Sequence, residues 1–242
     1  MVSERDARWR RAAHVLGLWL RYAGDHPHPG QALADFRDWI TTTFLGRDLL
    51  TAELPWITFP ALRWLRAYLR PSMSVFEWGS GASTIFLARR VGRVVSIEYD
   101  AGWCEAVATR LRAHGLGNAE LRHLPPEPGD DDALYRSSAA EFVGLSFRRY
   151  VQSVLEHPDR AFDVILVDGR ARLGCVVTAL PKLRDDGVLI LDDSEREDAA
   201  EACTLLAARG WTARHFTGPG PHSVWPVFSR TTAFFRVPPE KA

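Results

Sequence analysis

The sequence predicts an α/β fold, a Rossmann-like, doubly wound sheet of seven mostly parallel strands with an N-terminal helical extension. From Ser72 onward, short apolar strands alternate with helical segments, the pattern of a parallel sheet with helices on both faces. The fourth strand, residues 162–169, is almost entirely apolar, as expected of a buried parallel strand. The pattern divides the chain into a helical extension or lid over residues 1–54 and a sheet domain over residues 55–242.

The elements follow from local patterns. Helices are expected over residues 4–24 and 31–46, because the HPHPG segment between them breaks a helix. A third helix is expected over residues 60–69. Within the sheet domain, helical segments include residues 134–156 and 195–209. The expected strands are residues 74–78, 93–100, 119–124, 162–169, 187–193, 211–216 and 231–237.

Composition narrows the class of protein. The formal net charge of the 242 residues is zero and the pI is about 7.1, so no global field attracts nucleic acid or an anionic membrane. Cys104, Cys175 and Cys203 are single and far apart, which predicts neither a disulfide framework nor a zinc site. No run approaches the roughly 20 apolar residues that span a bilayer. We expect a soluble cytoplasmic protein.

The turn after the first strand carries the strongest signal. Gly79 and Gly81 stand where the chain must turn sharply and let a ligand approach the backbone. Ser80 lies between them, and Ser83 follows at the start of a helix, where a hydroxyl can cap free N–H groups. Glu77 precedes the turn, and its carboxylate would repel a pyrophosphate. That charge favours a ligand with a cationic ammonium group, such as the methionine part of S-adenosylmethionine (SAM).

The end of the second strand supplies a second binding signal. Glu98 lies 19 residues after Gly79 and is followed by Tyr99. A carboxylate at this position can accept hydrogen bonds from both hydroxyls of a ribose. A dinucleotide fingerprint would have glycine or alanine where this chain has Thr84, which weakens the interpretation as a nicotinamide site.

These segments resemble a known family. VFEWGSGASTIFLARRVGRVVSIEYD is similar to motifs I and II of the class I SAM-dependent methyltransferases, and FDVILVDGR and GVLILDD are similar to that family's fourth and fifth strands. The resemblance implies that Glu77, Gly79 and Gly81 surround the methionine moiety and that Glu98 binds the ribose. Ser80, Ser83 and Tyr99 complete the expected cofactor site.

The expected reaction centre lies at the ends of the fourth and fifth strands. Asp168, Asp192 and Asp193 should meet at one rim of the sheet, where three carboxylates suit Mg²⁺. This spacing resembles the metal-dependent O-methyltransferases. Arg170 stands where related sugar-modifying enzymes often have an aspartate, so a metal-free arrangement remains open, with Arg170 binding substrate or neutralising the carboxylates. Asp168 and Arg170 are the predicted catalytic residues.

The predicted function is methyl transfer from SAM to a small-molecule hydroxyl, with sugar, phenol, carboxylate and nitrogen acceptors all open. Nucleic acid and membrane are not expected as partners, and a second copy of the chain is a candidate partner. Two alternatives remain, a nicotinamide-dependent oxidoreductase and a non-catalytic protein that binds SAM or S-adenosylhomocysteine (SAH). His222 and Trp225 lie in a loop where they could line the acceptor pocket.

Overall fold

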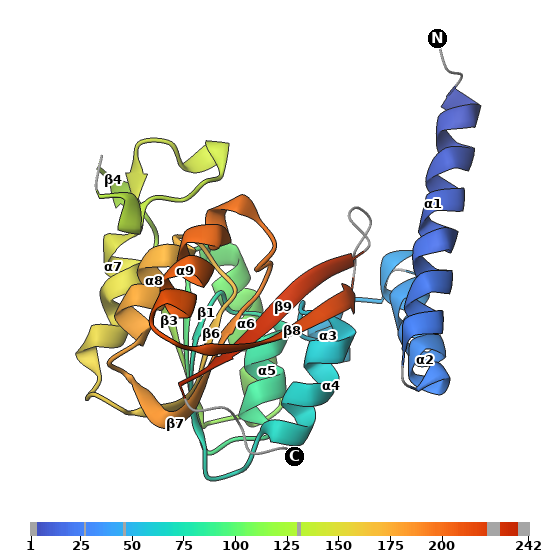
Figure 1. Cartoon of the computed structure of the whole chain (residues 1–242). Helices are drawn as coiled ribbons and strands as arrows, with labels where there is room; N and C mark the ends of the chain where they lie inside the picture. Colours follow the sequence, from blue (N-terminus) through green and yellow to red (C-terminus); the bar gives the residue numbers. More distant parts are fainter. Residues whose placement is uncertain (1–3, 27, 46, 130–131, 222–227, 237–242) are drawn as a thin grey trace.

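The computed structural model describes residues 4–26, 28–45, 47–129, 132–221 and 228–236. A seven-stranded sheet forms its centre, with the strand order β3-β2-β1-β6-β7-β9-β8 (Figure 1). The pairings from β3 to β7 are parallel, and β9 runs antiparallel to both β7 and β8. The expected doubly wound, mostly parallel sheet is confirmed. Its strands are β1 Ser74–Trp78, β2 Arg93–Glu98, β3 Ala119–His123, β6 Phe162–Val167, β7 Leu183–Leu191, β8 Thr212–Pro219 and β9 Phe228–Phe235.

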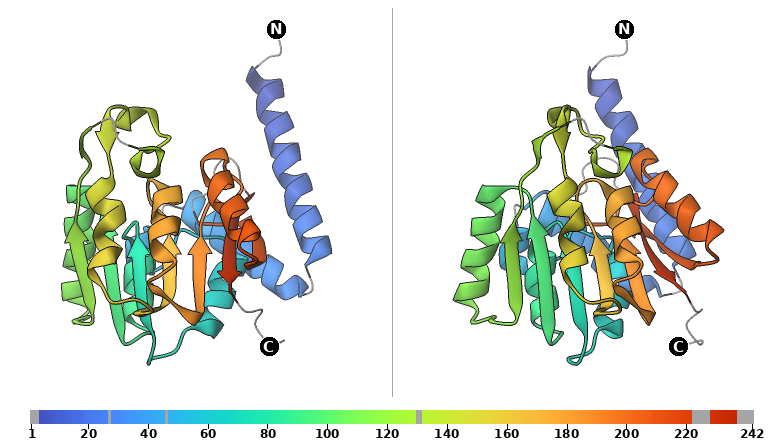
Figure 2. Two further views of the ribbon diagram at one scale, coloured as in Figure 1. Left: turned by 60° about the vertical axis from the view of Figure 1, so that its left-hand side comes forward. Right: turned by 90° about the vertical axis from the view of Figure 1, so that its left-hand side faces the viewer.

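Helices cover both faces of the sheet (Figure 2). Alternate side chains of each strand point to opposite faces, so β1 places Val75 in one hydrophobic core and Phe76 and Trp78 in the other. Both cores are closed by amphipathic helices. The first face carries α4 Phe59–Tyr68, α5 Ala82–Ala88 and α6 Ala101–Ala113, and the second carries α7 Arg148–Gln152, α8 Arg172–Ala179 and α9 Glu197–Ala208.

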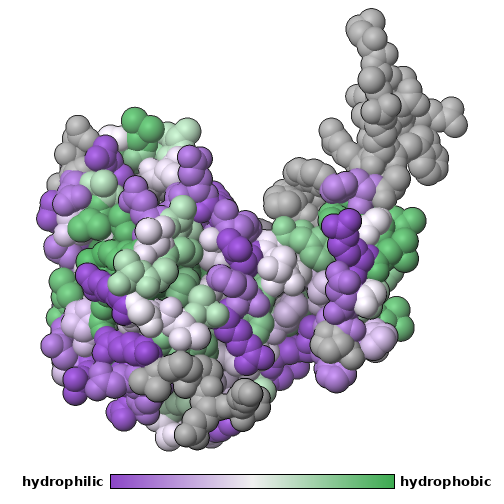
Figure 3. Space-filling view, in the orientation of Figure 1, coloured by the Kyte–Doolittle hydropathy of each residue, from purple (hydrophilic) through white to green (hydrophobic). Residues whose placement is uncertain are grey.

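An N-terminal arm, which we define as helices α1 (Glu4–Asp25) and α2 (Pro29–Thr43), lies beside the β8–β9 edge of the sheet (Figure 2). Trp19 of α1 is buried and contacts Phe228 of β9 with ring centroids 5.7 Å apart. Figure 3 shows hydrophobic side chains on the outer side of the arm. Leu33 of α2 is 69% exposed. A four-residue helix, α3 (Leu49–Ala52), which the sequence did not predict, leads from the arm toward the sheet domain.

The prediction of one helix over residues 134–156 is wrong. The segment contains short 3₁₀ turns at Ala133–Tyr135, Ala140–Phe142 and Ser153–Glu156, and only α7 between the last two is α-helical. Gly144 adopts a φ of 78°, which interrupts a right-handed helix. Strand β5 (Leu145–Ser146) then pairs with β4 (Glu127–Pro128) in a two-stranded ribbon. Within the described residues, no helix is long and apolar enough to cross a membrane.

Candidate functional site

A pocket of about 1030 Å³ opens at the carboxyl ends of β1, β2, β6 and β7. This is where the strand order reverses between β1 and β6, the usual ligand position in a doubly wound sheet. All but one of the residues predicted for the site line it. They are Gly79, Ser80, Gly81, Ser83, Glu98, Tyr99, Asp168, Arg170, Asp192 and Asp193. The exception is Glu77, which is buried beneath the turn.

The two glycines of the turn serve different purposes. Gly79 has a φ of 93°, and a Cβ added there would come within 2.3 Å of the Asp168 carbonyl oxygen. The backbone N–H of Gly79 donates to the Ile97 carbonyl at 2.9 Å. Glycine is required at this position, because any side chain would collide with the backbone that follows β6. A Cβ on Gly81 would meet the Trp103 indole at 3.7 Å and the Ser83 hydroxyl at 3.9 Å, both ordinary contact distances. Gly81 therefore leaves space on the pocket side.

Glu98 organises the turn. Its Oε2 accepts hydrogen bonds from the backbone N–H and the hydroxyl of Ser80, at 3.0 and 2.9 Å. Its Oε1 accepts from the N–H groups of Tyr99 and Asp100, at 2.8 and 2.9 Å. Burial raises the pKa of Glu98, and these hydrogen bonds oppose that increase. A ribose that binds here would take the place of the Ser80 hydroxyl, because the other three donors are backbone groups.

Glu77 is fully buried behind the turn. Its Oε2 accepts from the hydroxyls of Thr84 and Ser96, both at 2.6 Å. Burial raises the pKa of Glu77 to about 7, although nearby hydroxyls, including that of Ser83, act in the opposite direction. Within the described residues, its Oε1 has no hydrogen-bond partner. Glu77 was expected beside the methionine moiety, but it does not line the pocket and instead supports the turn from behind, so the residues that fit SAM are Ser80, Gly81 and Glu98.

The acceptor side of the pocket is formed by carboxylates after two adjacent strands. The Asp168 N–H donates to the Trp78 carbonyl, and the Asp192 N–H to the Val167 carbonyl, both at 3.0 Å. Asp192 is buried, and Thr231 donates to its Oδ1 at 2.5 Å. Burial, and then the neighbouring Asp192, raise the pKa of Asp168 well above its usual range. Burial and Asp193 raise the pKa of Asp192 to about 7.

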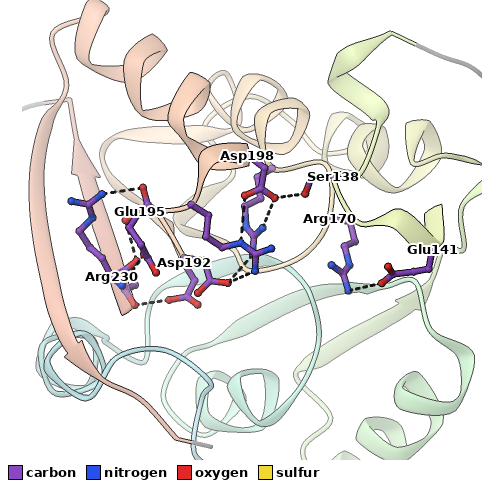
Figure 4. A network of polar contacts seen from close by, with 12 residues as sticks. Ser138, Glu141, Arg170, Asp192, Glu195, Asp198 and Arg230 are labelled. Carbon is purple, nitrogen blue, oxygen red and sulfur yellow. Dashed lines mark hydrogen bonds and ion pairs between the residues drawn. The ribbon is translucent and has the colours of Figure 1, made fainter. Parts of the chain in front are cut away.

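Arg170 and Arg172 contact different partners, and Figure 4 shows Arg170 directed toward Glu141. Arg170 donates to the Tyr99 hydroxyl at 3.1 Å and lies 3.9 Å from a Glu141 oxygen. Arg170 therefore does not neutralise the strand-end carboxylates, which was one of its two predicted metal-free roles. Its other predicted role was to bind the substrate. Arg172 does neutralise those carboxylates, because it donates to Asp193 at 3.2 Å. Arg172 was not among the predicted site residues, and its only signal in the sequence is that it is the second arginine after β6.

The predicted metal site does not have the geometry of one. The described residues contain no group of three His, Cys, Asp or Glu side chains that could hold a metal ion. Asp193 has a φ of 51°, and its Oδ2 accepts hydrogen bonds from both Arg172 and Arg196. Three carboxylates gather at one rim as expected, but two guanidinium groups share one oxygen of Asp193. The residues present do not fit a divalent ion.

Other residues were missed or lie elsewhere. Trp103 of α6 donates from its indole to the Ser80 carbonyl at 2.6 Å and lines the pocket. Trp56, which is 59% exposed, lines it from the segment after α3. Neither could be placed from sequence, because aromatic residues are common in helix–sheet contacts. His222 and Trp225 lie outside the described residues.

No family model matches the chain. Over 118 residues, it is 31% identical to the 23S rRNA (uracil(1939)-C(5))-methyltransferase RlmD of Pseudomonas aeruginosa, a match that covers 46% of this chain and 26% of that protein. The chain thus spans about a quarter of the curated relative's length. Among solved structures, the O-methyltransferase of Bacillus cereus in complex with SAH has a TM-score of 0.58 at 19% identity, covering 84% of this chain and 97% of that one. The precorrin-6y C5,15-methyltransferase of Geobacter metallireducens has a TM-score of 0.52 at 11% identity, covering 74% and 87%.

The fold is that of the class I SAM-dependent methyltransferases, and the predicted resemblance is confirmed at this level. The expectation of a small-molecule acceptor without a nucleic-acid partner is contradicted, because the curated relative is named for ribosomal RNA. That expectation relied on a net charge of zero. Net charge averages over the whole surface, so a value of zero does not exclude a nucleic-acid partner.

Proposed function

We propose that the chain is a SAM-dependent methyltransferase that acts on RNA. The observation that carries the first part is the Glu98–Ser80 pair beside Gly81, at the strand-order reversal of a methyltransferase fold. Glu98 would hold the ribose of SAM, and Glu77 would support the turn from behind. The cofactor itself supplies the reactive methyl group, and the protein positions and desolvates the acceptor. The rival nicotinamide site is disfavoured by Thr84, which stands where a dinucleotide fingerprint has glycine or alanine.

The acceptor is proposed from the curated relative and from the chemistry of the pocket. The relative methylates a uracil carbon, which generally requires a covalent nucleophile such as a thiolate. No cysteine is among the described residues that line this pocket, and Cys175 is buried in the core. An acceptor atom that is itself a nucleophile fits better. In RNA, the ribose 2′-hydroxyl is such an atom, consistent with the O-methylation that the sequence predicted.

Asp168 is the proposed general base for that hydroxyl. It lines the pocket directly after β6, where a carboxylate can accept the proton of a bound hydroxyl. The aromatic face of Trp56 and the cations of Arg170 and Arg196 also line the pocket, where they suit a base and its flanking phosphates. Arg170 thus becomes a substrate-binding candidate.

Cofactor binding is tested by calorimetry with SAH and with NAD. Wild-type protein should bind SAH and not NAD. Glu98→Gln should weaken SAH binding by about 2 kcal/mol, because it removes a charge-assisted acceptor. Glu105→Gln is the matched control, since Glu105 is on the exposed side of α6. Equal SAH affinity for the two variants would contradict the assignment of Glu98.

Acceptor choice is tested with SAM that carries a labelled methyl group. Ribosomal RNA, transfer RNA and DNA are incubated with the protein, and the labelled nucleosides are identified by mass spectrometry after digestion. We expect 2′-O-methyl nucleosides from RNA, lost in Asp168→Asn and retained in the surface variant Asp186→Asn. Labelled C5-methyluridine would show that the acceptor is the uracil carbon and not the 2′-hydroxyl. If the protein binds SAH but labels no RNA, RNA is not the acceptor.

A further inference from the structure

Arg172 lies at the centre of the carboxylate group on the acceptor side. It is the first residue of α8 and follows Ala171, whose φ of 50° turns the chain sharply after β6. Its side chain is only 7% exposed. One guanidinium nitrogen donates to Asp198 at 3.0 Å and another to Asp193 at 3.2 Å. Arg172 therefore bridges the end of β7 and the start of α9 from inside the protein.

The oxygens that face Arg172 have further donors. Arg196 contacts the same two carboxylates, at 3.1 Å from Asp193 and 3.6 Å from Asp198, from a side chain that is 49% exposed. Ser138 donates to Asp198 at 2.7 Å. Two guanidinium groups thus meet the same two carboxylates, that of Arg172 from the interior and that of Arg196 from the surface.

A divalent ion would compete directly with this arrangement. Mg²⁺ and Ca²⁺ need at least about six oxygen ligands at short distances, and a buried fixed cation beside them adds repulsion. Arginine suits the place better than lysine, because its planar fork reaches two carboxylates at once. Burial lowers the pKa of Arg172. The carboxylates of Asp198 and of the strand ends raise it by more, so the guanidinium group stays charged.

We propose that Arg172 is a tethered cation that takes the place of a divalent ion among Asp168, Asp192 and Asp193, and that this acceptor site works without metal. Arg172 is thus a positioning residue, which holds Asp193 and Asp198 and offsets the charge beside Asp168. Its role in methyl transfer rests on the proposed function, whereas its role as the cation of the cluster does not. Removing Arg172 should expose a carboxylate group with an affinity for divalent cations that the wild-type protein lacks.

The probe is Mn²⁺, whose binding to the full chain is measured by electron paramagnetic resonance and by the shift in melting temperature. Arg172→Gln should bind Mn²⁺ at least about tenfold more tightly than wild type, because the fixed charge is gone. Arg196→Gln is the matched control, since it removes the exposed cation from the same carboxylates and keeps Arg172. Arg172→Lys retains a buried charge and should gain no Mn²⁺ affinity.

Mn²⁺ binding to wild type as tight as to Arg172→Gln would overturn the proposal, as would an equal gain in Arg196→Gln. If Arg172→Gln does not fold, the proposal is tested with wild type and Arg172→Lys. Binding of Mn²⁺ by either protein at the Asp168–Asp193 rim would contradict the proposal that Arg172 replaces a divalent ion. SAH binding is measured on the same samples. Loss of the proposed function would appear as no SAH binding by wild type, independently of the Mn²⁺ result.

Discussion

Glu77 is a carboxyl group without access to solvent, held by two hydroxyl groups at the back of the cofactor turn. Burial raises its pKa from 4.5 to about 7 in the folded protein. An acid whose pKa is raised by folding binds more protons in the folded than in the unfolded state between those values. The free energy of unfolding therefore decreases as the pH rises from 4.5 to about 7.

The first prediction concerns Glu77→Gln, which keeps the shape of the side chain and cannot ionise. Relative to the variant, wild type should lose about 3 kcal/mol of stability across that pH interval and then remain level. Urea unfolding of both proteins from pH 4 to 8 measures the difference. A stability difference that is independent of pH would show that Glu77 ionises with an ordinary pKa.

The second prediction separates the two glycines of the turn. Gly81→Val should retain its melting temperature and lose at least about tenfold in SAH affinity, because the added side chain projects into open space on the pocket side. Gly79→Ala should instead lose stability, because its Cβ would collide with the Asp168 carbonyl. Calorimetry and thermal unfolding distinguish the cases. Normal SAH binding by Gly81→Val would place the cofactor elsewhere.

At the scale of elements, the arm is fastened to the sheet domain by a buried ion pair. Asp35 of α2 is 3% exposed and pairs with Arg63 of α4. The Tyr22 hydroxyl of α1 donates to the same carboxylate at 2.5 Å. One carboxylate thus joins both helices of the arm to α4. None of the described pocket-lining residues comes from α1 or α2, and the lid assigned to residues 1–54 remains a proposal.

The third prediction is that Arg63→Met loosens the arm. The substitution leaves Asp35 buried with only Tyr22 beside it, which should cost about 3 kcal/mol. Hydrogen exchange of the α2 amides should become faster than in wild type. Arg37→Met is the control, because Arg37 pairs with Asp38 on the exposed side of the same helix. Similar exchange in both variants would show that the Asp35 pair does not hold the arm.

At the scale of the whole molecule, the mostly parallel sheet and the pocket position could be predicted because they follow from periodicity and from the glycine turn. Glu98 ends β2 and Asp168 follows β6, the two parallel strands on either side of β1, so the sequence places them at one rim. The partners of the carboxylates could not be predicted. Whether Arg170 or Arg172 reaches Asp193 depends on the left-handed Ala171 between them, and no local pattern encodes that turn. The short helices of residues 134–156 were missed for a similar reason at Gly144.

The Trp103 indole forms one wall of the cofactor turn, 40% exposed and hydrogen-bonded to the Ser80 carbonyl at 2.6 Å. The fluorescence of an indole depends on the polarity around it. A ligand that covers the Trp103 ring should therefore shift the emission wavelength and change the intensity. The fourth prediction is that SAH shifts the tryptophan fluorescence of the protein and that Trp103→Phe abolishes the shift, although eight other tryptophans remain. An unchanged response in Trp103→Phe would assign the signal to another ring. The turn thus carries its own optical reporter, through which cofactor entry could be timed without a label.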